Sequence, residues 1–256
     1  MLLAIDVGNT HVACGLYKDR ALRFHWRLAT RAEATGDELA VFFRGLLGLE
    51  NLSFDDVHGV IIASVVPQMT DSWRTFSRKH LELDPLFVDA GLDTGMPVLT
   101  DNPSEVGADR LVNAVAAYHH HPGALIVVDF GTAITFDCVA PQGAYLGGAI
   151  VPGIGISLEA LGQKAAKLPR LDISVAPASP IGTNTVAAIQ AGILYGFGGL
   201  VDGLVGRIRQ QMAPAVPKVI ATGGMAGLVA PHAASIESIE PMLTLEGLRL
   251  LHERNK

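Results

Sequence analysis

Two apolar runs, each ending in an Asp-x-Gly sequence, open the two halves of the chain. The first run leads into Asp6-Val7-Gly8-Asn9-Thr10, and the second leads into Asp129-Phe130-Gly131-Thr132-Ala133. Continuous apolar runs that stop at glycine predict fully buried strands. Further strand patterns follow each run, at residues 11–17 and 22–28 in the first half and at residues 134–139 and 145–150 in the second. Each half is therefore predicted to open as a β-meander with an aspartate at its first bend.

The two halves also close alike. An apolar run at residues 60–64 precedes a helical pattern over residues 67–80, and a run at residues 219–224 precedes a helix from about Met225. The other segments with a helical pattern are residues 36–47, 104–119, 156–161, 183–209 and 243–254. The helix that begins near Ser104, with Ser104 as its N-cap, is predicted to bridge the halves.

This internal repeat resembles the duplicated ribonuclease-H-like fold of the actin, sugar kinase and Hsp70 ATPases. The predicted fold class is therefore α/β, with two such domains, residues 1–115 and 116–256, around a nucleotide cleft. The alternative is chance, because an Asp-Gly pair is common turn chemistry in hairpins. Two occurrences, each after a buried strand and each followed by the same order of elements, favour duplication.

Composition and charge exclude several classes of protein. The 256 residues include 25 acidic and 19 basic side chains, which leaves a net charge of −6. No Lys/Arg block stands out, so we expect no nucleic-acid partner. Cys14 and Cys138 form no Cys-x-x-Cys, which argues against a disulfide framework or a cysteine zinc site and fits a reducing cytoplasm.

Two long stretches without Asp, Glu, Lys or Arg, residues 138–158 and 173–201, raise the question of a membrane. Their length alone would admit a spanning helix. Both are interrupted by proline and by many glycine, serine, threonine or asparagine residues. We interpret them as glycine-rich buried structure and expect no membrane partner.

The two common glycine-loop motifs for phosphates are absent. The sequence contains no G-x-x-x-x-G-K-[ST], and no G-x-G-x-x-G follows a strand. The hairpin residues Gly8, Asn9 and Thr10, with Gly131 and Thr132, are the candidates instead. Glycine lets the backbone approach a phosphate closely, and turn amides bind anions.

Three carboxylates are candidates for the chemistry. Asp6 and Asp129 beside a polyphosphate would need a cation in between; the alternative is that both bind their own turn amides. Asp109 follows Gly107, which is about 1 kcal/mol less favourable in a helix than alanine and so indicates a close approach. The alternative for Asp109 is an ordinary surface pair with Arg110.

The motifs together resemble those of the type III pantothenate kinases. Four of them occur in the family's order and near its spacing: Asp6 to Thr10, Asn102 to Arg110, Asp129 to Ala133 and Ile181 to Thr185. Residues 152–157 and 221–224 match as well, so the resemblance covers essentially the whole chain. The Gly107-Ala108-Asp109-Arg110 block after Asn102-Pro103 is the most specific part.

The resemblance implies an activity and its cofactors. The family phosphorylates the terminal hydroxyl of pantothenate in the first step of coenzyme A synthesis. It uses ATP, a divalent cation such as Mg²⁺, and a monovalent cation, K⁺ or NH₄⁺. Family members form homodimers with the pantothenate pocket at the subunit boundary. The small residues of segment 183–209, which predict close helix packing in the core or across such a dimer, agree with this.

The resemblance also implies a role for each matching residue. The ATP contacts would be Asp6, Val7, Gly8, Asn9, Thr10, His11, Val12, Ala13 and Thr132. The pantothenate contacts would be Gly107, Ala108, Asp109, Arg110 and Thr185, with Asp109 as the proton acceptor. The monovalent cation would bind to Asp129.

Two features depart from this picture or lie outside it. Many family members have a tyrosine that lies against pantothenate where this chain has Thr100, so position 100 is not assigned to the pocket. The tract His119-His120-His121 is typical of a metal site, but we favour its interpretation as a helix end, where positive charge complements the helix dipole.

Two alternative functions remain open from the sequence. One is a kinase of another small hydroxylated substrate, and the other is a non-catalytic accessory protein of the same fold. The Gly107 to Arg110 block argues against the first. The presence of Asp6, Asp109 and Asp129 argues against the second.

Overall fold

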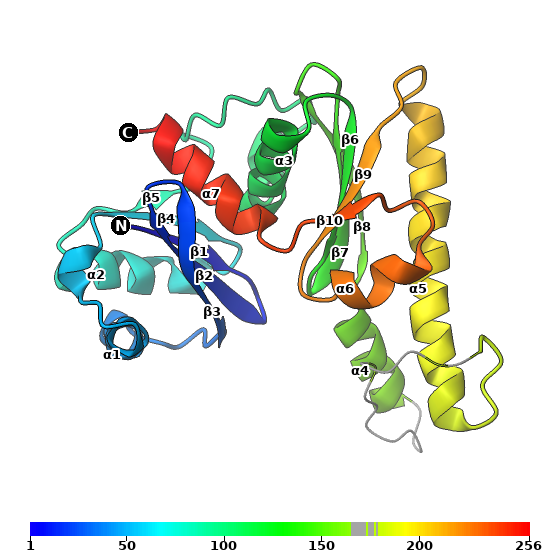
Figure 1. Cartoon of the computed structure of the whole chain (residues 1–256), viewed down its shortest axis with the longest axis horizontal. Helices are drawn as coiled ribbons and strands as arrows, with labels where there is room; N and C mark the ends of the chain where they lie inside the picture. Colours follow the sequence, from blue (N-terminus) through cyan, green and yellow to red (C-terminus); the bar gives the residue numbers. More distant parts are fainter. Residues whose placement is uncertain (165–172, 174–176, 178) are drawn as a thin grey trace. The chain divides into compact units, whose positions relative to one another are not determined.

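The computed structural model describes residues 1–164, 173, 177 and 179–256. The chain folds into two compact units. Unit 1 comprises Met1–Met96, Asp101–Ala116 and Leu243–Lys256, and unit 2 comprises Pro97–Thr100 and Ala117–Met242 (Figure 1). The C-terminal segment therefore belongs to unit 1, although it follows unit 2 in sequence. The predicted division into residues 1–115 and 116–256 stays a prediction.

Unit 1 contains a five-stranded sheet in the order β3-β2-β1-β4-β5. Its strands are β1 (Leu2–Val7), β2 (His11–Lys18), β3 (Ala21–Ala29), β4 (Gly59–Ser64) and β5 (Leu86–Phe87). The first three strands pair antiparallel, as the meander pattern predicts, while β4 pairs parallel with β1 and β5 with β4. The side chains of β1 are buried on both faces of the sheet, in two separate hydrophobic clusters, which explains its continuous apolar run.

Helices bury both faces of this sheet. Its helical segments are α1 (Gly36–Leu49), η1 (Phe54–Asp56), η2 (Pro67–Met69), α2 (Thr70–His80), η3 (Pro103–Glu105), α3 (Ala108–His120) and α7 (Leu243–Arg254). On one face, Phe43 of α1 packs against Trp73 and Phe76 of α2 within the hydrophobic core. On the other face, Leu245 and Leu248 of α7 pack in a core with residues of β1 and β4, which is why the C-terminal helix joins unit 1.

Helix α3 begins later than the sequence pattern predicts. The predicted start at Ser104 is wrong, because residues Pro103–Glu105 form a separate 3-10 turn. Val106 then has an extended backbone with ψ of 122°, so helical hydrogen bonding cannot continue through it. Ser104 consequently does not cap α3, whose first turn carries Asp109.

Unit 2 repeats the sheet of unit 1. Its elements are β6 (Leu125–Phe130), β7 (Ala133–Val139), β8 (Tyr145–Pro152), α4 (Ile154–Lys164), α5 (Thr185–Gln211), β9 (Lys218–Thr222), α6 (Ala226–Val229), η4 (Ala230–His232) and β10 (Ser238–Ile239). The strand order is β10-β9-β6-β7-β8. Strands β6, β7 and β8 pair antiparallel and β9 pairs parallel with β6, in the same way as their counterparts in unit 1. The predicted duplication of a ribonuclease-H-like unit is thereby confirmed.

Helix α5 is the one described helix that is long and apolar enough to cross a membrane by length and composition. Only 28% of its most apolar window is buried within the chain. Its exposed positions include a row of glycines. Length and composition are therefore weak grounds for a span.

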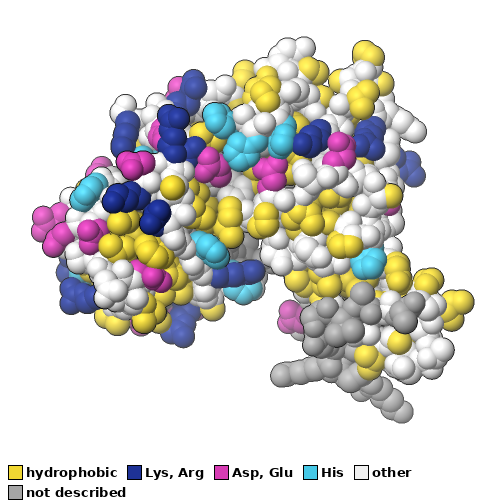
Figure 2. Space-filling view, viewed as in Figure 1, with side chains coloured by type: hydrophobic (Ala, Val, Ile, Leu, Met, Phe, Trp, Pro, Cys, Tyr) yellow, Lys and Arg dark blue, Asp and Glu magenta, His cyan; other side chains and the backbone are white. Residues whose placement is uncertain are grey.

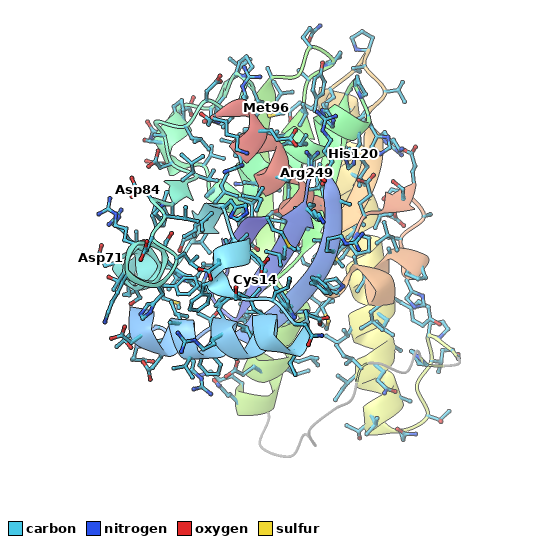
Figure 3. The ribbon with its side chains drawn as sticks, turned by 60° about the vertical axis from the view of Figure 1, so that its left-hand side comes forward. Cys14, Asp71, Asp84, Met96, His120 and Arg249 are labelled. Carbon is cyan, nitrogen blue, oxygen red and sulfur yellow. The ribbon has the colours of Figure 1, made fainter. Side chains whose placement is uncertain are left out.

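The remaining sequence expectations concern the cysteines and the surface. Cys14 of β2, labelled in Figure 3, and Cys138 of β7 are both buried and free. Burial raises the pKa of the Cys14 thiol, as expected of an inert core cysteine. On the face shown in Figure 2, basic side chains are interspersed with acidic ones.

Candidate active site

The first Asp-x-Gly sequence forms a tight exposed turn between β1 and β2. The amide of Gly8 donates a hydrogen bond to the carbonyl oxygen of His11 at 3.0 Å, and this bond closes the turn. A Cβ on Gly8 would lie 3.0 Å from that same oxygen, so the turn has little room for any side chain there. Asp6 lies at the end of β1, opposite Ala13 of β2, and is partly buried. The predicted ATP contacts from Asp6 to Ala13 thus form one continuous hairpin.

The second Asp-x-Gly sequence forms the equivalent turn in unit 2. Gly131 donates its amide to the carbonyl oxygen of Ala133 at 3.1 Å, and Thr132 is exposed at the tip. Gly153, at the end of β8, donates its amide to the carbonyl oxygen of Thr132 at 3.1 Å. A Cβ on Gly153 would overlap that oxygen, so only glycine allows this approach.

Asp129 lies at the base of the second turn. It stands opposite Thr135 of β7 and beside Thr222 of β9. Gly223 follows with a φ of +92°, and a Cβ there would overlap the Asp129 carboxylate. The backbone of Gly223 therefore packs directly against one side of the Asp129 side chain. Ala221 to Gly224 match a family motif, but the sequence alone does not single out Gly153 or Gly223 as site residues.

The Gly107 to Arg110 block forms the start of α3 in unit 1. The amide of Arg110 donates to Asp109 Oδ1 at 2.8 Å. A Cβ on Gly107 would lie 2.6 Å from the same oxygen, which is the close approach that the glycine indicated. Before this block, the Asn102 side-chain amide donates to Glu105 Oε1 at 3.0 Å across the 3-10 turn.

Burial sets the protonation behaviour of Asp109. Burial raises the pKa of its carboxyl group above the ordinary aspartate value, although the Arg110 amide and guanidinium act in the opposite direction. A carboxylate that is less well solvated than a surface aspartate is a stronger proton acceptor. Asp109 is therefore a partly buried carboxylate rather than an exposed ion-pair partner.

Thr185 is the first residue of α5 and is exposed. Asn184 caps this helix, because its side-chain oxygen accepts a hydrogen bond from the Ala187 amide at 2.9 Å. Gly182 packs against the same turn so closely that a Cβ would overlap the Ala188 backbone. The Ile181 to Thr185 motif thus fixes the start of α5. Unit 1 carries the first hairpin and the Gly107 to Arg110 block, and unit 2 carries Asp129, Thr132 and Thr185.

The histidine tract lies at the end of α3, where two of its side chains contact a glutamate. His120, labelled in Figure 3, and His121 contact the two carboxylate oxygens of Glu240 at 3.0 and 2.6 Å. Lys218 Nζ lies 3.0 Å from His121 Nδ1. Within the described part of the chain, no group of three or more His, Cys, Asp or Glu side chains is arranged to hold a metal ion.

A match to a protein-family model tests the family membership that these motifs predict. The model described as type III pantothenate kinase matches residues 2–207. The chain belongs to the type III pantothenate kinase family. Two relatives with that name, from Geobacter sp. (strain M21) and Geotalea uraniireducens (strain Rf4), are 50% and 51% identical over 256 residues. The alignments cover 100% of this chain and 100% and 99% of the relatives.

Solved structures support the fold of this type III pantothenate kinase family member. A Campylobacter jejuni protein described as a putative Baf family transcriptional activator matches with a TM-score of 0.61 at 18% identity, covering 99% of this chain and 98% of that one. A ROK family glucokinase from Streptomyces griseus matches with a TM-score of 0.57 at 10% identity, covering 98% and 99%. At such low identity these likenesses establish the actin-like ATPase fold and nothing more.

The raised pKa of Asp109 predicts a gain in stability when the carboxylate is removed. An aspartate with a folded-state pKa above its unfolded value destabilises the folded chain once pH exceeds the unfolded value, and this cost disappears in acid. We therefore expect Asp109→Asn to raise the Tm at neutral pH and to lose that advantage near pH ~3. Calorimetry across this range checks it. A lower Tm for the variant at neutral pH would contradict the assigned pKa direction.

Proposed function

We propose that this chain transfers the γ-phosphoryl group of ATP to the terminal hydroxyl of pantothenate. The product is 4′-phosphopantothenate, and the reaction is the first step of coenzyme A biosynthesis. The observation that carries this proposal is the family match over residues 2–207, supported by full-length relatives of the same name. We also propose that the reaction takes place in the cytoplasm, in keeping with the two free cysteines.

The two Asp-x-Gly hairpins are the proposed ATP contacts. Phosphoryl transfer passes through a loose transition state, so the protein contributes mainly by positioning the phosphates and stabilising their charge. The exposed turn after Asp6 and the exposed tip at Thr132 both present backbone groups on glycine-containing turns. Such turns can approach phosphate oxygens closely and donate amide hydrogen bonds.

The start of α3 is the proposed pantothenate cradle. Asp109 accepts the proton of the attacking hydroxyl, and its raised pKa suits that role. Arg110 offers a planar guanidinium for the carboxylate of pantothenate. Gly107 and Ala108 complete the proposed cradle, and Thr185 is proposed as a further hydroxyl contact.

Replacement of the proposed base should slow phosphoryl transfer without weakening the binding of pantothenate. We expect Asp109→Asn to fold, to bind pantothenate and to lower kcat by about 10²–10⁴, the usual contribution of a general base. Steady-state kinetics with calorimetric titration of pantothenate measures both quantities. Glu105→Gln, on the exposed 3-10 turn, is the control and should keep its kcat. A folded Asp109→Asn protein with normal kcat would rule out Asp109 as the base.

Two kinds of cation are proposed to act with ATP. Magnesium is commonly held by one or two carboxylates together with substrate phosphates, so it needs no dedicated protein cluster. The partly buried Asp129 fits a monovalent cation, because it is an oxygen donor beside the second turn and Gly223 leaves no side chain in the way. Potassium or ammonium held there would offset the repulsion between this carboxylate and the nucleotide phosphates.

The cation role of Asp129 predicts a dependence on ion size. Turnover in potassium should fall sharply when tetramethylammonium replaces it, because that ion is too large for direct contact with the carboxylate. Asp129→Asn should abolish the response to potassium while the protein still folds. Initial rates over a potassium titration measure this. A wild-type protein that is equally active in tetramethylammonium would remove Asp129 from the cation role.

Helix α5 is the proposed contact between two copies of the chain. Gly192, Gly196, Gly199, Gly203 and Gly206 are exposed along one stripe of the helix. A Cβ at any of them would meet no described atom within 4 Å. Each glycine costs about 1 kcal/mol relative to alanine in a helix, so a stripe of them is unfavourable in an isolated chain. Close packing against a second α5 would offset this cost, in keeping with the homodimer that the family resemblance implies.

A bulky side chain on this stripe should therefore break the dimer. We expect the wild-type chain to sediment as a dimer and Gly199→Leu as a monomer with unchanged helix content by circular dichroism. The matched control is Gly45→Leu on α1, an exposed helical glycine that also meets nothing within 4 Å among the described residues. If Gly199→Leu remains dimeric, the α5 stripe is not the interface.

A further inference from the structure

The residue that follows β3 forms hydrogen bonds with the turn between β1 and β2, which is the first of the two proposed ATP contacts. The hydroxyl of Thr30 donates to the carbonyl oxygen of Gly8 at 2.6 Å. The amide of Thr30 donates to the carbonyl oxygen of Thr10 at 3.0 Å. A single residue, one step beyond β3, therefore binds two of the carbonyl groups of the turn.

These two bonds determine where the amides of the turn point. In a planar trans peptide group the carbonyl and the following N–H point in opposite directions. Since the carbonyls of Gly8 and Thr10 face Thr30, the amides of Asn9 and His11 face away from it. Carbonyl oxygens would repel a polyphosphate, whereas amides attract it. Thr30 thus holds these two carbonyl groups on its own side of the turn and leaves the amides of Asn9 and His11 on the other side.

Unit 2 contains the same support for its own turn. Gly153, one step beyond β8, donates its amide to the carbonyl oxygen of Thr132, as Thr30 does to Thr10. Strands β3 and β8 occupy equivalent places in the two sheets. The hydroxyl bond of Thr30 to Gly8 is an addition that Gly153 cannot make, because glycine has no side chain.

A second contact from β3 fixes the side chain of His11. Arg27 Nη2 lies 3.0 Å from His11 Nδ1. A guanidinium can only donate hydrogen bonds, so Nδ1 must be the acceptor and the proton of the neutral ring must be on Nε2. Burial and the charge of Arg27 both lower the pKa of His11, which favours the neutral ring. The exposed His11 side chain therefore offers an Nε2–H donor at the turn.

We propose that Thr30 and Arg27 are positioning residues for the ATP phosphates. Thr30 orients the amides of Asn9 and His11 toward the phosphoryl oxygens, and Arg27 fixes the His11 tautomer that donates from Nε2. Arg27 also places a permanent positive charge beside the turn in a protein whose net charge is −6. This inference rests on the proposed function, because it takes the Asp6 to Ala13 hairpin as the ATP site.

The hydroxyl of Thr30 can be tested with a nearly isosteric pair. Thr30→Val should raise the KM for ATP about tenfold, as expected for one lost hydrogen bond, and leave the KM for pantothenate unchanged. Thr30→Ser keeps the hydroxyl and should restore the wild-type KM for ATP. A residue that merely supported the fold would change both KM values together and lower the Tm, and that outcome would overturn the proposal.

The role of Arg27 can be tested without activity. Nitrogen-15 spectra of the imidazole in the full chain should show His11 with its proton on Nε2. Arg27→Met should give a mixture of tautomers, and Arg27→Gln, whose amide can still donate to Nδ1, should keep the wild-type signature. A wild-type signature in Arg27→Met would overturn the proposal, whether or not the Thr30 variants fold well.

One further variant separates this inference from the proposed ATP site. Thr10→Val removes a hydroxyl from the turn itself and should raise the KM for ATP. If Thr10→Val raises it and Thr30→Val does not, the ATP site stands and the positioning role fails. If neither variant changes the KM for ATP, the assignment of this hairpin to ATP fails, and the inference fails with it.

Discussion

The structure depends on one recurring constraint, the close approach of backbone to backbone at the turn after the first strand of each sheet. In unit 1 the Gly8 amide reaches the His11 carbonyl, and in unit 2 the Gly131 amide reaches that of Ala133. Gly153 enforces the approach on the second turn, because a Cβ there would overlap Thr132. Gly8 is also tightly placed, since a Cβ there would lie 3.0 Å from the carbonyl oxygen of His11.

Close packing of the main chain also surrounds two of the candidate carboxylates, Asp109 and Asp129. Gly107 and Gly223 allow the main chain to pack directly against Asp109 and Asp129. Burial raises the pKa of the Asp109 carboxyl group, which is a cost to folding and would favour the proton transfer proposed for it. Stability is commonly given up at functional sites in this way. Steric constraints therefore explain why glycine occupies positions 107 and 223 in the Gly-Ala-Asp-Arg and Thr-Gly-Gly motifs, in addition to the family resemblance.

Much of the architecture could be predicted from the sequence because strand and helix patterns are local. The repeated Asp-x-Gly meanders predicted both sheets, and apolar periodicity predicted α1, α2, α5 and α7. The start of α3 could not be predicted, because the extended backbone at Val106 depends on how the 3-10 turn at Pro103 ends. Strands β5 and β10 are only two residues long, too short for a periodic signal. Within the candidate site, the motifs identified the aspartates, whereas the contacts of Thr30 and Gly153 arise from strand pairing between residues far apart in sequence.

The most direct test of the account is the identity of the phosphorylated product. The purified chain should be incubated with ATP, Mg²⁺, potassium and pantothenate and followed by phosphorus-31 NMR. We expect a new phosphomonoester resonance from 4′-phosphopantothenate that grows in equal amount with ADP and is absent without pantothenate. Consumption of ATP with release of inorganic phosphate alone would contradict it, as would phosphorylation of a sugar in place of pantothenate.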